Sequence, residues 1–230
     1  MLSRPAKKLD RGKFFTNRLP MRKGTLITFE GIEGAGKSSQ LELLAKQLRS
    51  AGRNVSAIRE PGGTELGEGI RPLLKEKGTP VCEKAELLLF LASRAQLVHE
   101  RILPALAEGT IVLCDRYSDS TLAYQWGARG LPIQLVKELD RFAAAACVPD
   151  RTILLDLPPE EGFRRIRAAR GGLSDRFEEE PLAFFQKVRA AYLQIARENP
   201  QRIAIVDGFR SPETVQLAVN AAVKELVTLS

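Results

Sequence analysis

A run of small and charged residues near the start of the chain has the spacing that phosphate binding requires. Residues 31–38 read GIEGAGKS and fit the pattern G-x-x-x-x-G-K-[ST]. In such a loop, backbone N–H groups surround a phosphate, and the first turn of the following helix adds partial positive charge. We expect Lys37 to reach the β- and γ-phosphates of a nucleoside triphosphate, and the Ser38 hydroxyl to bind Mg²⁺. An ordinary glycine-rich turn is the alternative.

Two more charged positions stand directly after apolar runs. Asp115 follows the run at 110–114, where an acidic residue can assist Mg²⁺ binding beside a phosphate-binding loop. Arg59 follows the run at 55–58 and precedes a loop that Pro61 and two glycines enforce. Ligand-binding residues of open α/β sheets collect at the carboxyl ends of strands, so both positions are candidates. A solvated loop would be the better interpretation of Arg59 if it stood alone.

A ring and a guanidinium lie four residues apart in a long helical pattern. Phe90 and Arg94 therefore share a helix face and can stack on a base and hydrogen-bond its edge. Taken alone, such a pair more often belongs to the core and the surface. Further along, the segment 118–130 (SDSTLAYQWGARG) is dense in small polar groups and aromatic rings.

Arginines recur in a helical pattern that a pair of glycines at 171–172 interrupts. A basic helix end broken by glycines can open and close as a lid, which we place at about 164–177. A solvated basic face would be the interpretation for a chain without a phosphate-binding loop. The arginines of this segment are Arg164, Arg165, Arg167 and Arg170.

Alternating strand and helix patterns position these residues. Apolar, β-branched runs predict five strands, at 25–30, 55–58, 110–114, 152–157 and 203–206. Helical spacing predicts helices after the glycine-rich loop, from 158 onward, and at 83–106, 136–146, 182–196 and 212–226. This alternation favours a mostly parallel sheet with helices on both faces.

The charge of the chain is concentrated at its start. Residues 1–23 carry eight basic side chains and one acidic one, whereas the remainder carries 27 of each sign. The balanced charge of the remainder gives no reason to expect nucleic-acid binding. The chain contains no run of eighteen apolar residues, so we expect no membrane span. We expect 1–23 to be a disordered extension without a catalytic role, and 24–230 to form one domain. A nucleic-acid-binding arm, a targeting peptide or the product of an early start codon are the alternatives for the extension.

Cysteine and histidine usage argues against several chemistries. Cys82, Cys114 and Cys147 are far apart and form no C-x-x-C pair. That spacing disfavours a disulfide framework or a zinc site and favours a reducing cytoplasm. The single histidine, His99, lies in a helical pattern far from any nucleophile motif, so we expect it at the surface or in helix packing.

Several separated motifs, taken in order, resemble those of bacterial thymidylate kinases. The resemblance covers roughly residues 24–228. It implies a P-loop nucleoside-monophosphate-kinase-like fold of three layers, with a five-stranded parallel sheet and a short lid. The glycine-rich loop alone indicates only a nucleotide-binding superfamily, whereas REPGGT together with DRY…AYQ is specific. The motifs are FEGIEGAGKSS, REPGGT, LFLASR, DRYSDSTLAYQ, LDLPPE and DRFE.

The resemblance implies that ATP and dTMP are converted into ADP and dTDP with Mg²⁺, in a cytoplasmic homodimer. Lys37 and Ser38 would hold the ATP phosphates and Mg²⁺, and Asp115 would serve the metal through water. The adenine site is indicated only by a candidate segment at 207–209. The implied ATP-binding residues are Gly31, Ile32, Glu33, Gly34, Ala35, Gly36, Lys37, Ser38 and Ser39, and the implied catalytic residues are Lys37, Arg116, Arg167 and Arg170.

On the dTMP side, the resemblance implies that Arg59 and Arg116 bind the phosphate. Planar, bidentate donors suit a doubly charged acceptor, which agrees with that role. Phe90 would stack on thymine, Arg94 would hydrogen-bond its O4 and Thr121 would read the N3 edge. The full implied set is Glu33 near the sugar 3′-hydroxyl, Arg59, Phe90, Arg94, Arg116, Ser120, Thr121, Tyr124 and Gln125.

One departure assigns a subtype. Some family members carry an arginine inside the glycine-rich loop, at the position of Gly34 here. The chain therefore resembles the subtype whose catalytic arginines lie in the lid. Arg167 and Arg170 are three apart and share a face, whereas Arg165 points elsewhere, so we expect the first two to lead.

Three alternative functions remain to be compared. Another nucleoside-monophosphate kinase would need a different reader of the base edge than Arg94 and Thr121. A regulatory GTPase or a DNA-associated ATPase is disfavoured, because no N-K-x-D motif is present and the body is not basic. A binding-only protein would be expected to lack Lys37, Ser38 or the lid arginines, and the chain retains all of them.

Overall fold

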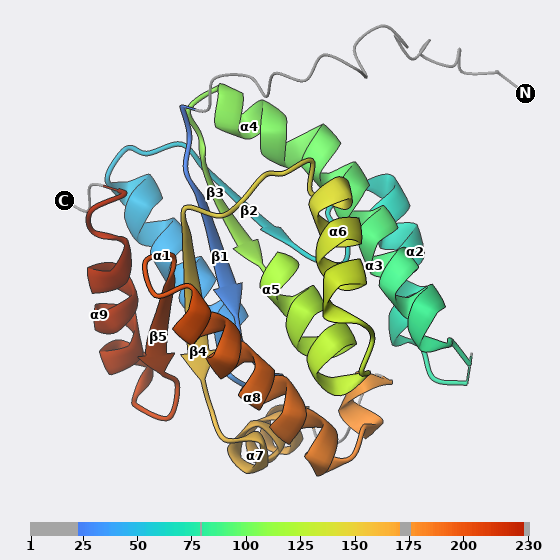
Figure 1. Cartoon of the computed structure of the whole chain (residues 1–230). Coiled ribbons are helices and arrows are strands. Elements are labelled where there is room, and N and C mark those ends of the chain that lie inside the picture. Colours follow the sequence, from blue (N-terminus) through green and yellow to red (C-terminus); the bar gives the residue numbers. More distant parts are fainter. Residues whose placement is uncertain (1–22, 79, 171–175, 228–230) are drawn as a thin grey trace, which may run out of the picture.

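The computed structural model describes residues 23–78, 80–170 and 176–227, and a central parallel sheet organises them. The order of its strands is β2-β3-β1-β4-β5, so β1 lies in the middle (Figure 1). The five predicted strands are confirmed, each end within one residue of its expected position. The strands are β1 (Leu26–Glu30), β2 (Val55–Arg59), β3 (Ile111–Asp115), β4 (Arg151–Asp156) and β5 (Ile203–Asp207).

Buried apolar side chains explain why these segments form inner strands. Every residue of β1 is buried, and Leu26 pairs in register with Val112 of β3, while Ile27 pairs with Arg151 of β4. All four strand pairs are parallel. Parallel sheets are normally covered on both faces, which matches the continuous burial of the central strand.

Helices cover both faces of the sheet, as predicted (Figure 1). On one face, α1 (Lys37–Ser50) packs on β1, β2 and β3 and against α9 (Pro212–Val223). On the other face, α4 (Leu103–Ala107) packs on β3, and α8 (Leu182–Glu198) packs on β4 and β5. The fold is therefore the expected three-layer arrangement.

The long helix predicted at 83–106 is one rod with a change of pitch. It consists of α3 (Glu83–Leu97), a π-helical segment (Val98–Ile102) and α4. Pro104 stands inside this rod, two residues after the π-helical segment, and its missing N–H removes one backbone hydrogen bond there. The other predicted helices are α6 (Ile133–Ala143), α7 (Pro159–Arg170), α8 and α9.

The sequence pattern does not predict two longer helical segments or the 3₁₀ turn Phe177–Glu179. One is α2 (Glu65–Lys75), which contains Gly67 and Pro72, residues with poor helix propensity. Capping and burial stabilise it, since the Thr64 hydroxyl accepts from the Gly67 N–H at 3.0 Å. The other comprises α5 (Ser118–Thr121) and a π-helical continuation (Leu122–Ala128).

Some expectations concern segments that the structure does not describe. The basic extension predicted at 1–23 lies outside the described residues except for Lys23, and so does the glycine pair at 171–172. Within the described ranges, no helix has both the length and the apolar character that crossing a membrane would need.

Candidate functional site

A cavity of about 860 Å³ opens where β1, β2 and β3 end. The carboxyl edge of a parallel sheet is the usual ligand site of such folds. We call Lys37, Ser38, Asp115 and Arg116 the phosphate end of the cavity, and Phe90, Arg94, Thr121 and Phe177 the base end. Figure 1 shows α1, which follows the glycine-rich loop, and α3, which carries Phe90, on opposite sides of the strands.

The glycine-rich loop packs its backbone against the first turns of α7. A Cβ atom on Gly34 would lie 2.4 Å from the carbonyl oxygen of Gly162, and one on Gly162 would lie 2.5 Å from that of Glu33. The φ of Gly34 is 76°, in the region that favours glycine. Position 34 therefore has no room for a side chain, and no arginine could stand there without moving α7.

Lys37 turns its ammonium group back into the loop. Its Nζ donates a hydrogen bond to the carbonyl oxygen of Ile32 at 2.8 Å. Burial, and then the positive charge of Arg116, lower the pKa of Lys37 from 10.5 to about 8. A bound phosphate would favour the charged form again, because an opposite charge nearby raises the pKa of an amine.

Ser38 and Asp115 join the start of α1 to the end of β3. The Ser38 hydroxyl donates to Oδ2 of Asp115 at 2.5 Å. A hydroxyl and a carboxylate are hard oxygen ligands, and Mg²⁺ commonly takes one or two protein carboxylates alongside waters and phosphates. Among the described residues, no group of three acidic, cysteine or histidine side chains is placed to hold a metal. The pair therefore fits a Mg²⁺ ion that arrives with nucleotide phosphates.

Arg116 adopts a left-handed backbone at the edge of the loop. Its φ is 70°, which is uncommon for a residue with a side chain and concentrates at functional sites. Its guanidinium donates to the carbonyl oxygen of Gly31 at 3.0 Å and to Oε1 of Glu33 at 2.7 Å. The Tyr124 hydroxyl donates to the second oxygen of Glu33 at 2.6 Å. Glu33 thus holds Arg116 and Tyr124 side by side.

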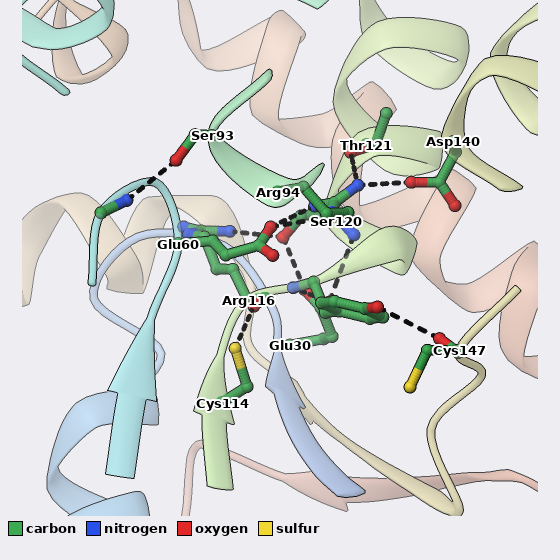
Figure 2. A network of polar contacts seen from close by, with 12 residues as sticks. Glu30, Glu60, Ser93, Arg94, Cys114, Arg116, Ser120, Thr121, Asp140 and Cys147 are labelled. Carbon is green, nitrogen blue, oxygen red and sulfur yellow. Dashed lines mark hydrogen bonds and ion pairs between the residues drawn. The ribbon is translucent and has the colours of Figure 1, made fainter. Parts of the chain in front are cut away.

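Glu30 lies fully buried beneath this edge, at the end of β1. It accepts hydrogen bonds from the Tyr117 backbone N–H at 2.7 Å, the Ser120 hydroxyl at 2.5 Å and the Tyr192 hydroxyl at 2.9 Å. Burial, and then the charge of Asp119, raise the pKa of Glu30 from 4.5 to about 7. The carboxyl group connects β1 to the first turn of α5 (Figure 2).

The guanidinium of Arg94 is buried and held by carboxylates (Figure 2). Its Nε and Nη2 donate to the same oxygen of Glu60 at 2.8 and 2.5 Å. Its Nη1 donates to the Thr121 hydroxyl at 2.7 Å and to Asp140. An arginine has five N–H donors, so these partners leave one N–H on Nη2 for a ligand. A single fixed donor suits one carbonyl oxygen of a base.

Aromatic rings form the wall beside Arg94. The Phe90 ring lies 5.9 Å from the Phe177 ring, and the Tyr124 ring lies 6.0 Å from it. Gln125 is buried and also lines the cavity. Phe177 was not among the expected site residues, although its motif, DRFE, is visible in the sequence. The motif was assigned only to the lid, and no local signal places its ring against α3.

The cavity lining contains most of the expected site residues. Gly31 and Ile32 do not line it, although the Ile32 carbonyl oxygen holds Lys37. On α7, Arg165 lines the cavity, whereas Arg164 and Arg167 are exposed and do not. The side chain of Arg170 lies outside the described residues. Expected residues that line the cavity are Glu33, Gly34, Ala35, Gly36, Lys37, Ser38, Ser39, Arg59, Phe90, Arg94, Asp115, Arg116, Ser120, Thr121, Tyr124 and Gln125.

Comparisons with known proteins agree with the motifs. The family model described as thymidylate kinase matches residues 29–219. A thymidylate kinase of Thermomicrobium roseum is 52% identical over 201 residues, which is 87% of this chain and 95% of the relative. One of Deinococcus radiodurans is 44% identical, covering 89% of this chain and 98% of the relative. The crystal structure of a thymidylate kinase from Ehrlichia chaffeensis superposes with a TM-score of 0.70 at 33% identity, covering 86% and 97% of the two chains.

Proposed function

The chain belongs to the thymidylate kinase family, and from that premise we propose how its cavity divides the work between two nucleotides. The enzyme phosphorylates dTMP to dTDP. One observation carries the assignment of roles: a single cavity contains both the glycine-rich loop and the Phe90–Arg94 pair, with Arg116 also lining it.

The phosphate end takes ATP in this proposal. The glycine-rich loop surrounds the phosphates, and Lys37 exchanges the Ile32 carbonyl for the β- and γ-phosphates. Ser38 and Asp115 would hold Mg²⁺, the latter through water. When bound, the ion would supply positive charge that neutralises the phosphates.

The base end takes dTMP. Phe90 stacks on thymine, the remaining N–H of Arg94 donates to O4 and Thr121 reads the N3 edge. Arg59 and Arg116 bind the phosphate, and the present ion pair of Arg59 with Glu68, at 3.3 Å, is exposed enough to exchange. The remaining side chains that would enclose the nucleoside are Glu33, Ser120, Tyr124 and Gln125.

Phosphoryl transfer then depends on positioning and charge. The acceptor oxygen of dTMP is already a competent nucleophile, so no strong general base is required. We assign the remaining positive charge to the lid, since position 34 cannot carry an arginine without displacing Gly162. Arg167 and Arg170 are the candidates from helical spacing, and Arg165 is added because it lines the cavity.

We also propose a homodimer in the cytoplasm. The adjoining helices α2, α3 and α6 expose large apolar side chains, which favours a protein–protein interface there (Figure 1). They are Leu66, Leu73, Leu88, Leu135 and Phe142. All three cysteines are free thiols, as in a reducing compartment. Light scattering of the purified enzyme, with Phe142→Asp as the disrupting variant, tests the dimer.

A panel of acceptors tests the function. ADP formation from ATP is measured with dTMP, dUMP, dCMP and the ribonucleotide of thymine. We expect dTMP to give the highest kcat/KM, and dCMP the lowest among the deoxynucleotides, because its amino group meets the N–H of Arg94. Lys37→Met is the inactive control. Equal rates with all acceptors would contradict the assignment of the base end.

A further inference from the structure

Glu86 is a buried carboxylate that does not line the cavity. It stands in the first turn of α3, four residues before Phe90, so the two side chains share a helix face. None of its surface is exposed. An isolated buried charge is strongly unfavourable, so the partners of Glu86 determine what it does.

Three side chains from two segments converge on this carboxylate: Gln125 and Arg129 from one helical segment, and Arg176 from far along the chain. Oε1 accepts from the Gln125 amide at 2.9 Å and from Nε of Arg129 at 3.1 Å. Oε2 accepts from Arg129 at 3.2 Å and from Arg176 at 2.6 Å. Glu180 pairs with Arg129 at 2.6 Å, so two carboxylates balance two guanidinium groups.

Arg176 joins this cluster to the chain immediately before Phe177. Its backbone N–H donates to the carbonyl oxygen of Lys75 at 2.9 Å, and its Nε donates to that of Leu74 at 3.1 Å. The Arg176 guanidinium lies 5.0 Å from the centre of the Phe177 ring. Glu86, through Arg176, therefore fixes where the Phe177 ring stands.

Two groups held by Glu86 form part of the cavity wall. Gln125 and Phe177 both line the cavity, and the Phe177 ring stands 5.9 Å from Phe90 and 6.0 Å from Tyr124. The Phe90 ring thus lies beside a ring whose own position depends on Arg176. A charge-assisted network of this kind holds side chains more rigidly than apolar packing alone.

We propose that Glu86 is a positioning residue for dTMP binding: it holds Phe177, through Arg176, and the Gln125 amide in the arrangement that the base end requires. This inference rests on the proposed assignment of that end to dTMP. Glu86 touches neither nucleotide, so its effect is confined to the affinity for the acceptor. ATP binds across the glycine-rich loop and is insensitive to it.

Glu86→Gln removes the charge and nearly keeps the shape. We expect the KM for dTMP to rise about tenfold, with the KM for ATP and kcat within about twofold. Glu83→Gln, at an exposed position in the first turn of the same helix, is the matched control and leaves all three constants unchanged. A merely structural role would lower the melting temperature and the active fraction without separating the two KM values.

A double-mutant cycle identifies the route. Phe177→Leu also raises the KM for dTMP, and combining it with Glu86→Gln gives less than the product of the two changes, because both act on the same ring. A fully multiplicative result, or equal effects of Glu86→Gln on both KM values, overturns the proposal. Arg176→Lys, which keeps the charge but not the planar fork, reproduces the KM separation; if it and Glu86→Gln both simply fail to fold, the cluster is structural and the proposal is wrong.

Phe90→Ala distinguishes an error in the assignment of the base end to dTMP from an error in the role of Glu86. If it leaves the KM for dTMP unchanged, the assignment of the base end itself is wrong. If it raises that KM while Glu86→Gln does not, the base end stands and only the role of Glu86 is lost.

Discussion

The phosphate end and the base end of the cavity hold their charged groups in different ways. At the phosphate end, Lys37 has a backbone carbonyl as its partner and Ser38 has Asp115, contacts that a phosphate and a metal ion can replace. At the base end, Arg94 is buried, and Glu86 is buried behind the cavity wall; each has several partners. The first set of contacts can exchange, whereas the second cannot without leaving charges buried.

This difference matches two tasks. A group that must follow charge as it moves between two nucleotides benefits from contacts that are weak enough to exchange. A group that must discriminate between bases benefits from having a single arrangement, since a preorganised donor loses no energy in reorientation. Mutations at the two ends should therefore affect different kinetic constants.

The largest expected effect of the difference between the two ends concerns kcat and the lid arginines. We expect alanine at one of Arg165, Arg167 or Arg170 to lower kcat by on the order of 10³, as for an arginine that meets the transferring phosphoryl group. The KM for dTMP should hardly change. Steady-state kinetics of the single variants measures both constants.

Arg164→Ala is the control on the same helix, because the Arg164 side chain is 70% exposed and paired with Glu161. Losses below about tenfold in kcat for every lid variant, roughly 1.4 kcal/mol, would remove the lid from the catalytic charge. The positive charge that meets the transferring phosphoryl group would then have to come from Lys37 and Mg²⁺ alone.

The second prediction concerns Glu30, at the end of β1 between the two ends of the cavity, and the pH dependence of protein stability that its raised pKa implies. Its folded-state pKa, raised from 4.5 to about 7, means that the folded protein favours the neutral acid. The resulting stabilisation is full below pH 4.5 and is lost as the pH rises through 7, a change of roughly 3 kcal/mol. Denaturant unfolding of the wild type and of Glu30→Gln, from pH 5 to 8, measures it.

The glutamine variant cannot ionise, so its stability relative to the wild type should increase from pH 5 to about pH 7 and then level off. A constant difference across the range would mean that Glu30 is already ionised in the folded protein at pH 5. Activity need not be measured for this comparison, which makes it independent of the kinetic tests.

Phe90→Ala sharpens the comparison from the base end. Stacking of a base on an aromatic ring contributes about 1–3 kcal/mol, so the KM for dTMP should rise by roughly one order of magnitude. The KM for ATP should stay constant, because the donor lies at the other end. An equal rise in both constants would identify Phe90 as a packing residue.

The smallest expected effect concerns protons at the phosphate end. With the pKa of Lys37 lowered to about 8, about half of the amine is neutral at pH 8 in the free enzyme. ATP binding at that pH should therefore take up about half a proton, because the phosphates favour the ammonium form. Calorimetry in two buffers of different ionisation enthalpy detects the uptake, and Lys37→Arg should abolish it.

The strands and the phosphate end could be predicted because their signals are local. Each strand is a contiguous apolar run, and the loop, Lys37 and Ser38 lie within eight consecutive residues. By contrast, α2 was missed because Gly67 and Pro72 oppose a helix locally, while burial of Ile70 and Leu74 favours it only in the folded protein.

Only part of the base end could be predicted from the sequence, because contacts between distant segments join its residues. Phe90 and Arg94 could be paired by helical spacing, but Asp140 and Glu86 gain their meaning from partners far along the chain. Helical spacing also predicts which lid arginines share a face of the helix, but it does not predict which face points into the cavity. In the structure that face carries Arg165, Ile166 and Ala169.

The central place of β1 has a consequence for how the enzyme is made. On one side β1 pairs with β3, where Leu26 meets Val112, and on the other with β4, where Ile27 meets Arg151. A nascent chain therefore carries the whole phosphate-binding motif for several seconds, at about 5–20 residues per second, before either neighbour of β1 exists. Until β4 leaves the ribosome, one edge of β1 is bare and available to the wrong partner. The step most exposed to misfolding is thus synthesis of the middle of the chain, and nucleotide binding can begin only after it is complete.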